Sequence, residues 1–245
     1  MKEKQDLGEQ AISTAAEVGL KSQLDEADNL EVDVRTDPGK LVQGELESVE
    51  IEGDGLVMEK DLRTEELDVD IDSIAIDPLK ATFGDIELKH PTDAQAHVVL
   101  TEKDIERAFN SQYIKHKLQN LQVKIDGKQT PVNVKKVNFT IPDNQKIALS
   151  AETQIVETGE TKQVAFTAVP KTTEGGNRVS LENVEYSQGK KASPELTKAL
   201  LNSASELLDL RNFELEGMKL RLQQLNLQKG KLTLEAEAHV EEFPD

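Results

Sequence analysis

The chain has 245 residues and a formal net charge of −18, which disfavours nucleic-acid binding because that binding depends on neutralising phosphates. It contains no cysteine, which excludes disulfides, zinc–thiolate sites, iron–sulfur clusters and thiol catalysis. Aromatic residues make up only 3% and tryptophan is absent, which argues against a carbohydrate cleft or a base-stacking surface.

The first expected element is a helix over residues 5–24, with small and apolar residues on one side at helical spacing. A short phrase then occurs twice, as Asp37-Pro38-Gly39-Lys40 and as Asp77-Pro78-Leu79-Lys80. In each copy Asp suits a helix N-cap, Pro suits the first helical position and a later glycine suits the exit. We interpret residues 30–52 and 67–88 as an internal duplication of one strand–turn–strand unit.

Most of the remaining chain shows apolar residues at every second position, which predicts antiparallel sheets with one dry and one wet face. Gly53-Asp54-Gly55 is interpreted as a hairpin turn between two such strands. A bulge absorbs a one-residue slip in this alternation and bends its strand, so several slips predict strongly curved sheets. The slips fall at Asp72-Ser73, at Lys135-Lys136, at Asn183-Val184 and between Leu222 and Leu225.

Two further helices interrupt the strands. One is expected from Thr101, its N-cap, to about Leu118, with a break near Asn110-Ser111. The other begins at Ser193-Pro194 and ends near Leu210. Because no long linker separates the halves, the sequence predicts a single α+β domain over residues 1–245.

The charge is distributed unevenly along the chain. Residues 1–89 hold 9 Lys and Arg against 25 Asp and Glu, whereas residues 111–146 hold 7 Lys against 2 Asp. Four lysines of this basic stretch are candidates for facing an anionic membrane: Lys115, Lys117, Lys124 and Lys128. The alternative is that they are solvated strand residues that prevent aggregation.

The sequence gives little support for catalysis, a metal or a cofactor. Asp68, Asp70 and Asp72 resemble the start of a calcium loop, but Ser73 and Leu79 occupy the positions that need Gly and an acid. The four histidines, His90, His97, His116 and His239, have no ligand spacing. We therefore expect a protein that is not an enzyme, although a hydrolase whose groups converge from distant segments stays open.

Several phrases, in this order, carry a resemblance to a known family: Ala15-Ala16-Glu17-Val18-Gly19-Leu20, Asp37 to Gly44, Gly53-Asp54-Gly55-Leu56, Pro91-Thr92-Asp93-Ala94, Leu100 to Asp104, Ala108-Phe109-Asn110-Ser111 and Leu207-Leu208-Asp209-Leu210. They resemble the LmeA-like group of bacterial phospholipid-binding proteins, which is related in fold to the tubular lipid-binding superfamily. The likeness covers about residues 5–243. It implies curved sheets rolled around the long N-terminal helix and two further helices, with an apolar tunnel for acyl chains.

The resemblance implies non-catalytic binding, and possible transfer, of phospholipid or fatty acid. No leader or membrane span is recognised in the sequence, so transient membrane contact on the cytoplasmic side is expected. The competing interpretation is a structural or interaction module with a solid core, and the oligomeric state stays open. The tunnel-lining candidates are Ile12, Leu20, Leu67, Val69, Ile71, Phe109, Ile114, Leu118, Val123, Phe139, Ile147, Leu149, Phe166, Met218, Leu220, Leu222, Leu234 and Ala236.

Overall fold

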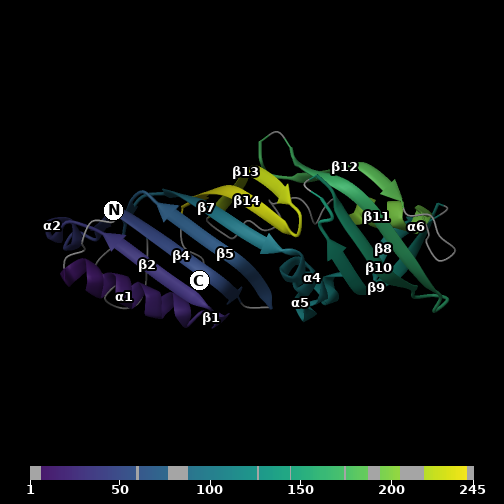
Figure 1. Ribbon diagram of the computed structural model, residues 1–245, viewed down its shortest axis with the longest axis horizontal. Coiled ribbons are helices and arrows are strands. Elements are labelled where there is room, and N and C mark those ends of the chain that lie inside the picture. The colour runs from purple at the N-terminus through teal and green to yellow at the C-terminus, as the bar shows by residue number, and fades with distance from the viewer. Residues whose placement is uncertain are drawn as a thin grey trace.

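The computed structural model shows an elongated α+β molecule built on two antiparallel sheets that lie one after the other along its length (Figure 1). The structure describes residues 7–58, 61–76, 88–125, 127–143, 145–173, 175–186, 194–204 and 218–241. The second Asp-Pro phrase, at residues 77–80, and the expected helix beyond residue 204 lie outside these ranges.

The first sheet has seven strands from both ends of the chain and is strongly curled in Figure 1. Its order is β1-β4-β5-β7-β14-β13, and β2 also pairs with β4. All of these pairs are antiparallel. The strands are β1 (Leu24–Glu26), β2 (Asn29–Arg35), β4 (Ser48–Met58), β5 (Leu62–Ile71), β7 (Thr92–Thr101), β13 (Met218–Gln228) and β14 (Lys231–Val240).

The expected turn at Gly53-Asp54-Gly55 is wrong, because these residues lie inside the long strand β4. Gly55 has a φ of 58°, and a side chain at Gly53 would collide with Leu56, whose Cδ1 lies 2.6 Å from the Cβ position. The glycines therefore let β4 change direction without ending. This explains how β4 pairs with β2 along one part and with β1 along the next.

The second sheet is a five-stranded meander in which each strand pairs with its neighbour in sequence, in the order β12-β11-β10-β9-β8. A small third sheet pairs β3 (Glu45–Leu46) with β6 (Ile74–Ala75). The meander strands are β8 (Leu121–Ile125), β9 (Lys128–Thr140), β10 (Ile147–Ile155), β11 (Thr161–Thr172) and β12 (Val179–Tyr186).

The helices begin largely where the capping signals predicted. Asp37 caps α2 (Pro38–Leu41), and Thr101 and Asp104 form a capping box on α4 (Glu102–Asn110). Ser111 then caps α5 (Gln112–Lys117), which confirms the expected break. Two more helices lie in the described ranges: α1 (Leu7–Lys21), which packs on β2, and α6 (Pro194–Ala204), which packs on β8 and β11.

Three of the four expected slips coincide with register shifts between paired strands. They lie at Lys135 in β9, at Asn183 in β12, which has a φ of 50°, and at Gln223 in β13. At the fourth position the strand ends instead: β5 stops at Ile71, and the short β6 begins at Ile74. Three of the slips therefore mark bulges inside strands, and the fourth marks the break between β5 and β6.

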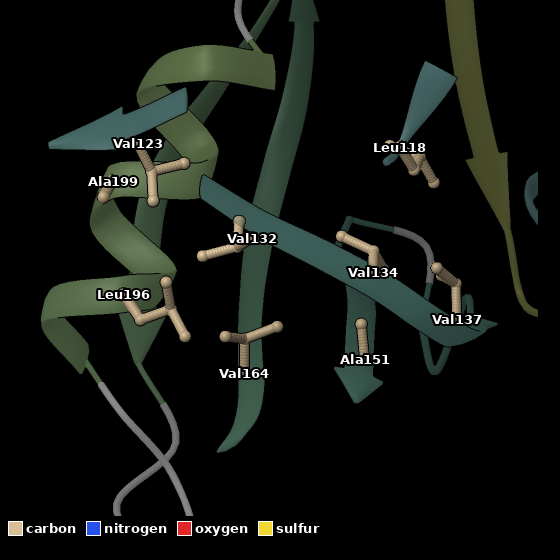
Figure 2. Packing of buried hydrophobic residues seen from close by; sticks show 9 residues of the cluster. All are labelled: Leu118, Val123, Val132, Val134, Val137, Ala151, Val164, Leu196 and Ala199. Carbon is tan, nitrogen blue, oxygen red and sulfur yellow. The ribbon is translucent and has the colours of Figure 1, made fainter. Parts of the chain in front are cut away.

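Buried side chains form three packed clusters. The largest lies on one face of the second sheet, where Leu196 and Ala199 of α6 pack over Val123, Val132 and Val164 (Figure 2). The second cluster joins α1 to the first sheet around Val32, Val34 and Val49, and the third surrounds Phe139, Ile141, Ile147, Phe166 and Ala168. Each sheet therefore packs at least part of one face against helices.

The two sheets meet through backbone hydrogen bonds at glycines. Gly230, in the turn between β13 and β14, donates to the carbonyl of Ile141 at 3.1 Å and accepts from the amide of Glu102 at 3.2 Å. Leu222, beside the bulge in β13, donates to the carbonyl of Gly176 at 2.7 Å. The hairpin β13–β14 is thus attached to both sheets.

Candidate functional site

The first sheet presents a continuous apolar face because the register of its strands aligns residues of the same parity. Leu67 of β5 lies opposite Val98 of β7, which lies opposite Leu234 of β14, which lies opposite Leu225 of β13. The next row, two residues along each strand, is Val69, Ala96, Ala236 and Leu222. We call these eight residues the apolar strip.

Most of the apolar strip lies outside the packed clusters. Seven of its eight residues are only partly buried, and Leu222 alone is fully buried. Among the described residues, none of the eight belongs to the three clusters. Within the described ranges, the strip is therefore an apolar surface outside the close packing of the three clusters.

Helix α1 and the small third sheet lie beside one end of this face. Ile12 and Ala16 pack in the cluster that contains Val34, and the buried Ser13 Oγ accepts a hydrogen bond from the amide of Val34 at 2.9 Å. In its principal contacts α1 therefore lies against β2 and β1, at the edge of the sheet.

The opposite face of the first sheet is acidic. Glu52, Asp68, His97 and Glu235 lie in register across β4, β5, β7 and β14, and His97 Nδ1 lies 2.6 Å from Glu235 Oε1. Partial burial raises the pKa of Asp68, His97 opposes that rise, and the neighbouring carboxylates add to it. One face of this sheet is therefore aliphatic at the strip, and the opposite face is acidic.

The sequence-predicted tunnel residues fall into two groups. Those of the first sheet lie on the strip or next to it, where Leu222 is buried, the others are partly buried, and Ile71 also packs against the second cluster: Leu67, Val69, Ile71, Leu220, Leu222, Leu234 and Ala236. Those of the second half lie within or against packed clusters: Phe109, Ile114, Leu118, Val123, Phe139, Ile147, Leu149 and Phe166. Ile12, on α1, packs against the second cluster, Leu20 is 37% exposed, and the side chain of Met218 lies outside the described part of the chain.

A basic groove lies at the junction of α4, α5 and β9, with a volume of about 660 Å³. We call it the basic groove and define it by its lining: Lys103, Glu106, Arg107, Asn110, Lys115, Lys135 and Lys136. Of the four lysines expected to face a membrane, it contains only Lys115. Lys117 lies over the ring of Tyr113, Lys124 is exposed on β8, and Lys128 pairs with Glu157.

A buried polar cluster fixes α4 beside the basic groove. Asp104, whose side chain is only 2% exposed, accepts from the amide and hydroxyl of Thr101 and from Arg63 at 2.6 Å. Burial raises the pKa of Asp104, but these hydrogen bonds and the Arg63 charge outweigh it and hold the pKa below its ordinary value. The start of α4 is therefore fixed to β5 and β7.

Sequence reasoning missed the partners that complete both surfaces. Val98 and Leu225 enter the strip through pairings between distant strands, which a period-two pattern does not reveal. Lys103 and Arg107 enter the groove from α4, and their i, i+4 spacing was the available signal.

Neither a metal centre nor a spanning helix is present in the part of the chain that the structure describes. In those ranges, no three histidine or acidic side chains are grouped to hold a metal ion. No described helix combines the length and the apolar character needed to cross a membrane. The apolar strip and the basic groove are the two candidate surfaces within the described ranges that match the apolar and basic patterns of the sequence.

Comparison with known proteins agrees with the apolar character of the strip. A family model described as LmeA-like phospholipid-binding matches residues 4–237, which is nearly the whole chain. No curated protein and no solved structure gives a significant match to the chain. The match covers both sheets and both surfaces described above. The chain therefore belongs to the LmeA-like phospholipid-binding family.

Proposed function

We propose that this protein binds phospholipid by laying acyl chains along the apolar strip, and that it carries lipid between membranes without catalysing a reaction. One observation carries the proposal: the strip combines aligned apolar side chains with incomplete burial, outside every packed cluster of described residues. The tunnel expected from the sequence is, in this proposal, the space over the strip.

The dimensions of the strip suit a lipid tail. Three strand spacings from β5 to β13 give the strip a width of about 14 Å, and its two rows lie about 7 Å apart along β5. The acyl region of one bilayer leaflet is about 15 Å thick. Removing one methylene from water gains about 0.8 kcal/mol, so burying even ten of them offsets a substantial ordering cost.

The chemistry of the strip favours tails over headgroups. Its eight side chains are all aliphatic, and Asp68 and Asp70 of β5 alternate onto the opposite face. Hydrophobic burial is non-directional, so it discriminates poorly between headgroups that share the same tails. We expect phospholipids with different headgroups and identical tails to compete within about tenfold.

Extraction of bound lipid from the purified protein tests the proposal. Organic extraction followed by mass spectrometry should give phospholipid or fatty acid near one molecule per chain. The delipidated protein should then bind a fluorescent phospholipid saturably, and unlabelled lipids should compete as described. Absence of both co-purified lipid and saturable binding would refute the proposal, and a thousandfold preference for one headgroup would refute its tail-based form.

A further inference from the structure

We propose that the basic groove is the surface by which this protein docks on bilayers that contain anionic phospholipids. Five of its seven lining residues are basic, and they come from three elements: Lys103 and Arg107 from α4, Lys115 from α5, and Lys135 and Lys136 from β9. The only acid in the lining is Glu106. Such a concentration of cations recognises the phosphate groups of a lipid surface.

The four lysines of the basic groove are exposed to solvent and form no ion pair with other described residues: Lys103, Lys115, Lys135 and Lys136. Arg107, in contrast, pairs with Asp61 at 2.6 Å. The four lysines are therefore the part of the groove available to an anionic surface.

The fold directs these lysines toward one place. Lys135 is the extra residue of the bulge in β9, since Glu152 pairs with Lys136 and Thr153 pairs with Val134. A bulge re-aims side chains, and here two consecutive lysines line the same groove instead of alternating between faces. The side-chain Nδ2 of Asn110 donates to the carbonyl of Val137 at 2.7 Å, which holds α4 against the bulged strand.

The charge of the remaining protein makes this surface directional. The net charge is −18, and the outer face of the first sheet carries acidic residues that include Glu50, Glu52, Asp68 and Asp70. An anionic membrane repels that face and attracts the groove, so the molecule is oriented before contact. At about 0.1 M salt the Debye length is about 10 Å, so the lysines act only near contact and docking is transient.

Docking through the basic groove would bring the apolar strip close to the membrane. The same helix α4 places Ile105 and Phe109 on its other side, in the cluster that also contains Leu227 and Leu232. Leu227 and Leu232 lie opposite each other in β13 and β14, two residues along from the row of Leu225 and Leu234. One helix therefore separates the groove from the end of the strip.

The test is sedimentation of the full chain with vesicles of phosphatidylcholine alone or mixed with phosphatidylglycerol. The test variant carries Lys103→Glu and Lys135→Glu, and the matched control carries Lys124→Glu and Lys198→Glu. Lys124 and Lys198 are exposed residues outside the groove, so both variants have the same net charge. We expect the test variant to lose at least about tenfold in binding to mixed vesicles, and the control to lose much less.

The vesicle measurements can support or contradict docking through the basic groove. Wild-type binding that falls steeply with added salt and is absent on phosphatidylcholine alone supports docking. Equal losses in both variants would overturn it, because only net charge would then matter. Saturable binding of inorganic phosphate, with competition against vesicles at millimolar concentration, would also overturn it in favour of a small-anion site.

Docking on vesicles and binding of acyl chains can be measured separately. Lipid bound by the Lys103→Glu and Lys135→Glu variant in solution should equal that of wild type when measured by extraction. Failure of acyl binding with intact docking would therefore reject only the proposed function. Loss of both in this variant, with an unchanged thermal melt, would mean that the groove is part of the lipid site and not a docking surface.

Discussion

Ala236 lies within the apolar strip, and replacing it with Trp distinguishes an acyl-binding surface from a packed core. It is partly buried and lies opposite Ala96 on β7 and Leu222 on β13. A Trp side chain buries roughly 150–250 Å², which is far more than the methyl group that it replaces. The variant therefore fills space over the strip wherever that space exists.

A dense core and an open strip predict different losses of Tm and of lipid affinity for this variant. Overpacking a dense core costs about 1–3 kcal/mol or more, which lowers Tm by roughly 2–12 °C in a chain of this size. On an open strip the indole meets no packed neighbours, so Tm should fall by less than about 3 °C. If the indole displaces three methylenes of a bound tail, it removes about 2.4 kcal/mol of binding free energy, which lowers the affinity roughly 50-fold.

The assay pairs a thermal melt with a fluorescent-lipid titration on the same preparation. Ala151→Trp is the packed control, because Ala151 is only 3% exposed within the largest cluster, and its Tm should fall sharply. Ala148→Trp is the surface control, because Ala148 has the opposite parity on β10, and both readouts should stay near wild type. Marked unfolding of Ala236→Trp with normal binding per folded molecule would refute the reasoning.

Three further changes test the fold around the two surfaces. Gly176→Ala should lower the free energy of unfolding by at least about 1 kcal/mol more than Gly175→Ala. Both glycines have positive φ, but a Cβ at Gly176 would lie 2.5 Å from the carbonyl oxygen of Leu222, whereas a Cβ at Gly175 would meet open space. Equal losses in urea denaturation would contradict this. Thr153→Val should raise that free energy by about 1 kcal/mol, because Thr153 is fully buried and its Oγ1 has no partner among the described residues; a lower melting temperature would contradict this. Asp104 has a pKa below its unfolded value, so its contribution to stability is present above about pH 4 and is lost as the pH falls through the folded pKa. Asp104→Asn should therefore be most destabilising near neutral pH and converge on wild type in acid denaturation, and a constant difference across pH would contradict this.

The local features of the fold followed from the sequence because they depend on neighbouring residues. Short stretches of sequence were enough to predict the cap at Thr101, the break near Ser111, the proline at the start of α6 and the bulge at Lys135. The error at Gly53 to Gly55 has a physical cause: two glycines suit a turn, but they equally suit a bend within a paired strand.

The two surfaces were harder to predict because each joins distant segments. Alternation places Leu67 and Leu234 on a dry face, but it does not say that β7 lies between their strands. The basic stretch was visible in the sequence, yet counting lysines alone selected Lys124 and Lys128 and omitted Lys103. Only the docking of α4 on β9 brings Lys103 next to Lys135.

The pairing of β7 with β14 has a consequence for how the protein folds. His97 and Glu235, which face each other in this pair, are 138 residues apart in the chain. The intervening meander has only sequence-adjacent pairings, so it can form early and fast, whereas the first sheet closes late. Until β14 is synthesised, β7 leaves an unpaired edge with an apolar face, so the half-made protein is its most aggregation-prone form.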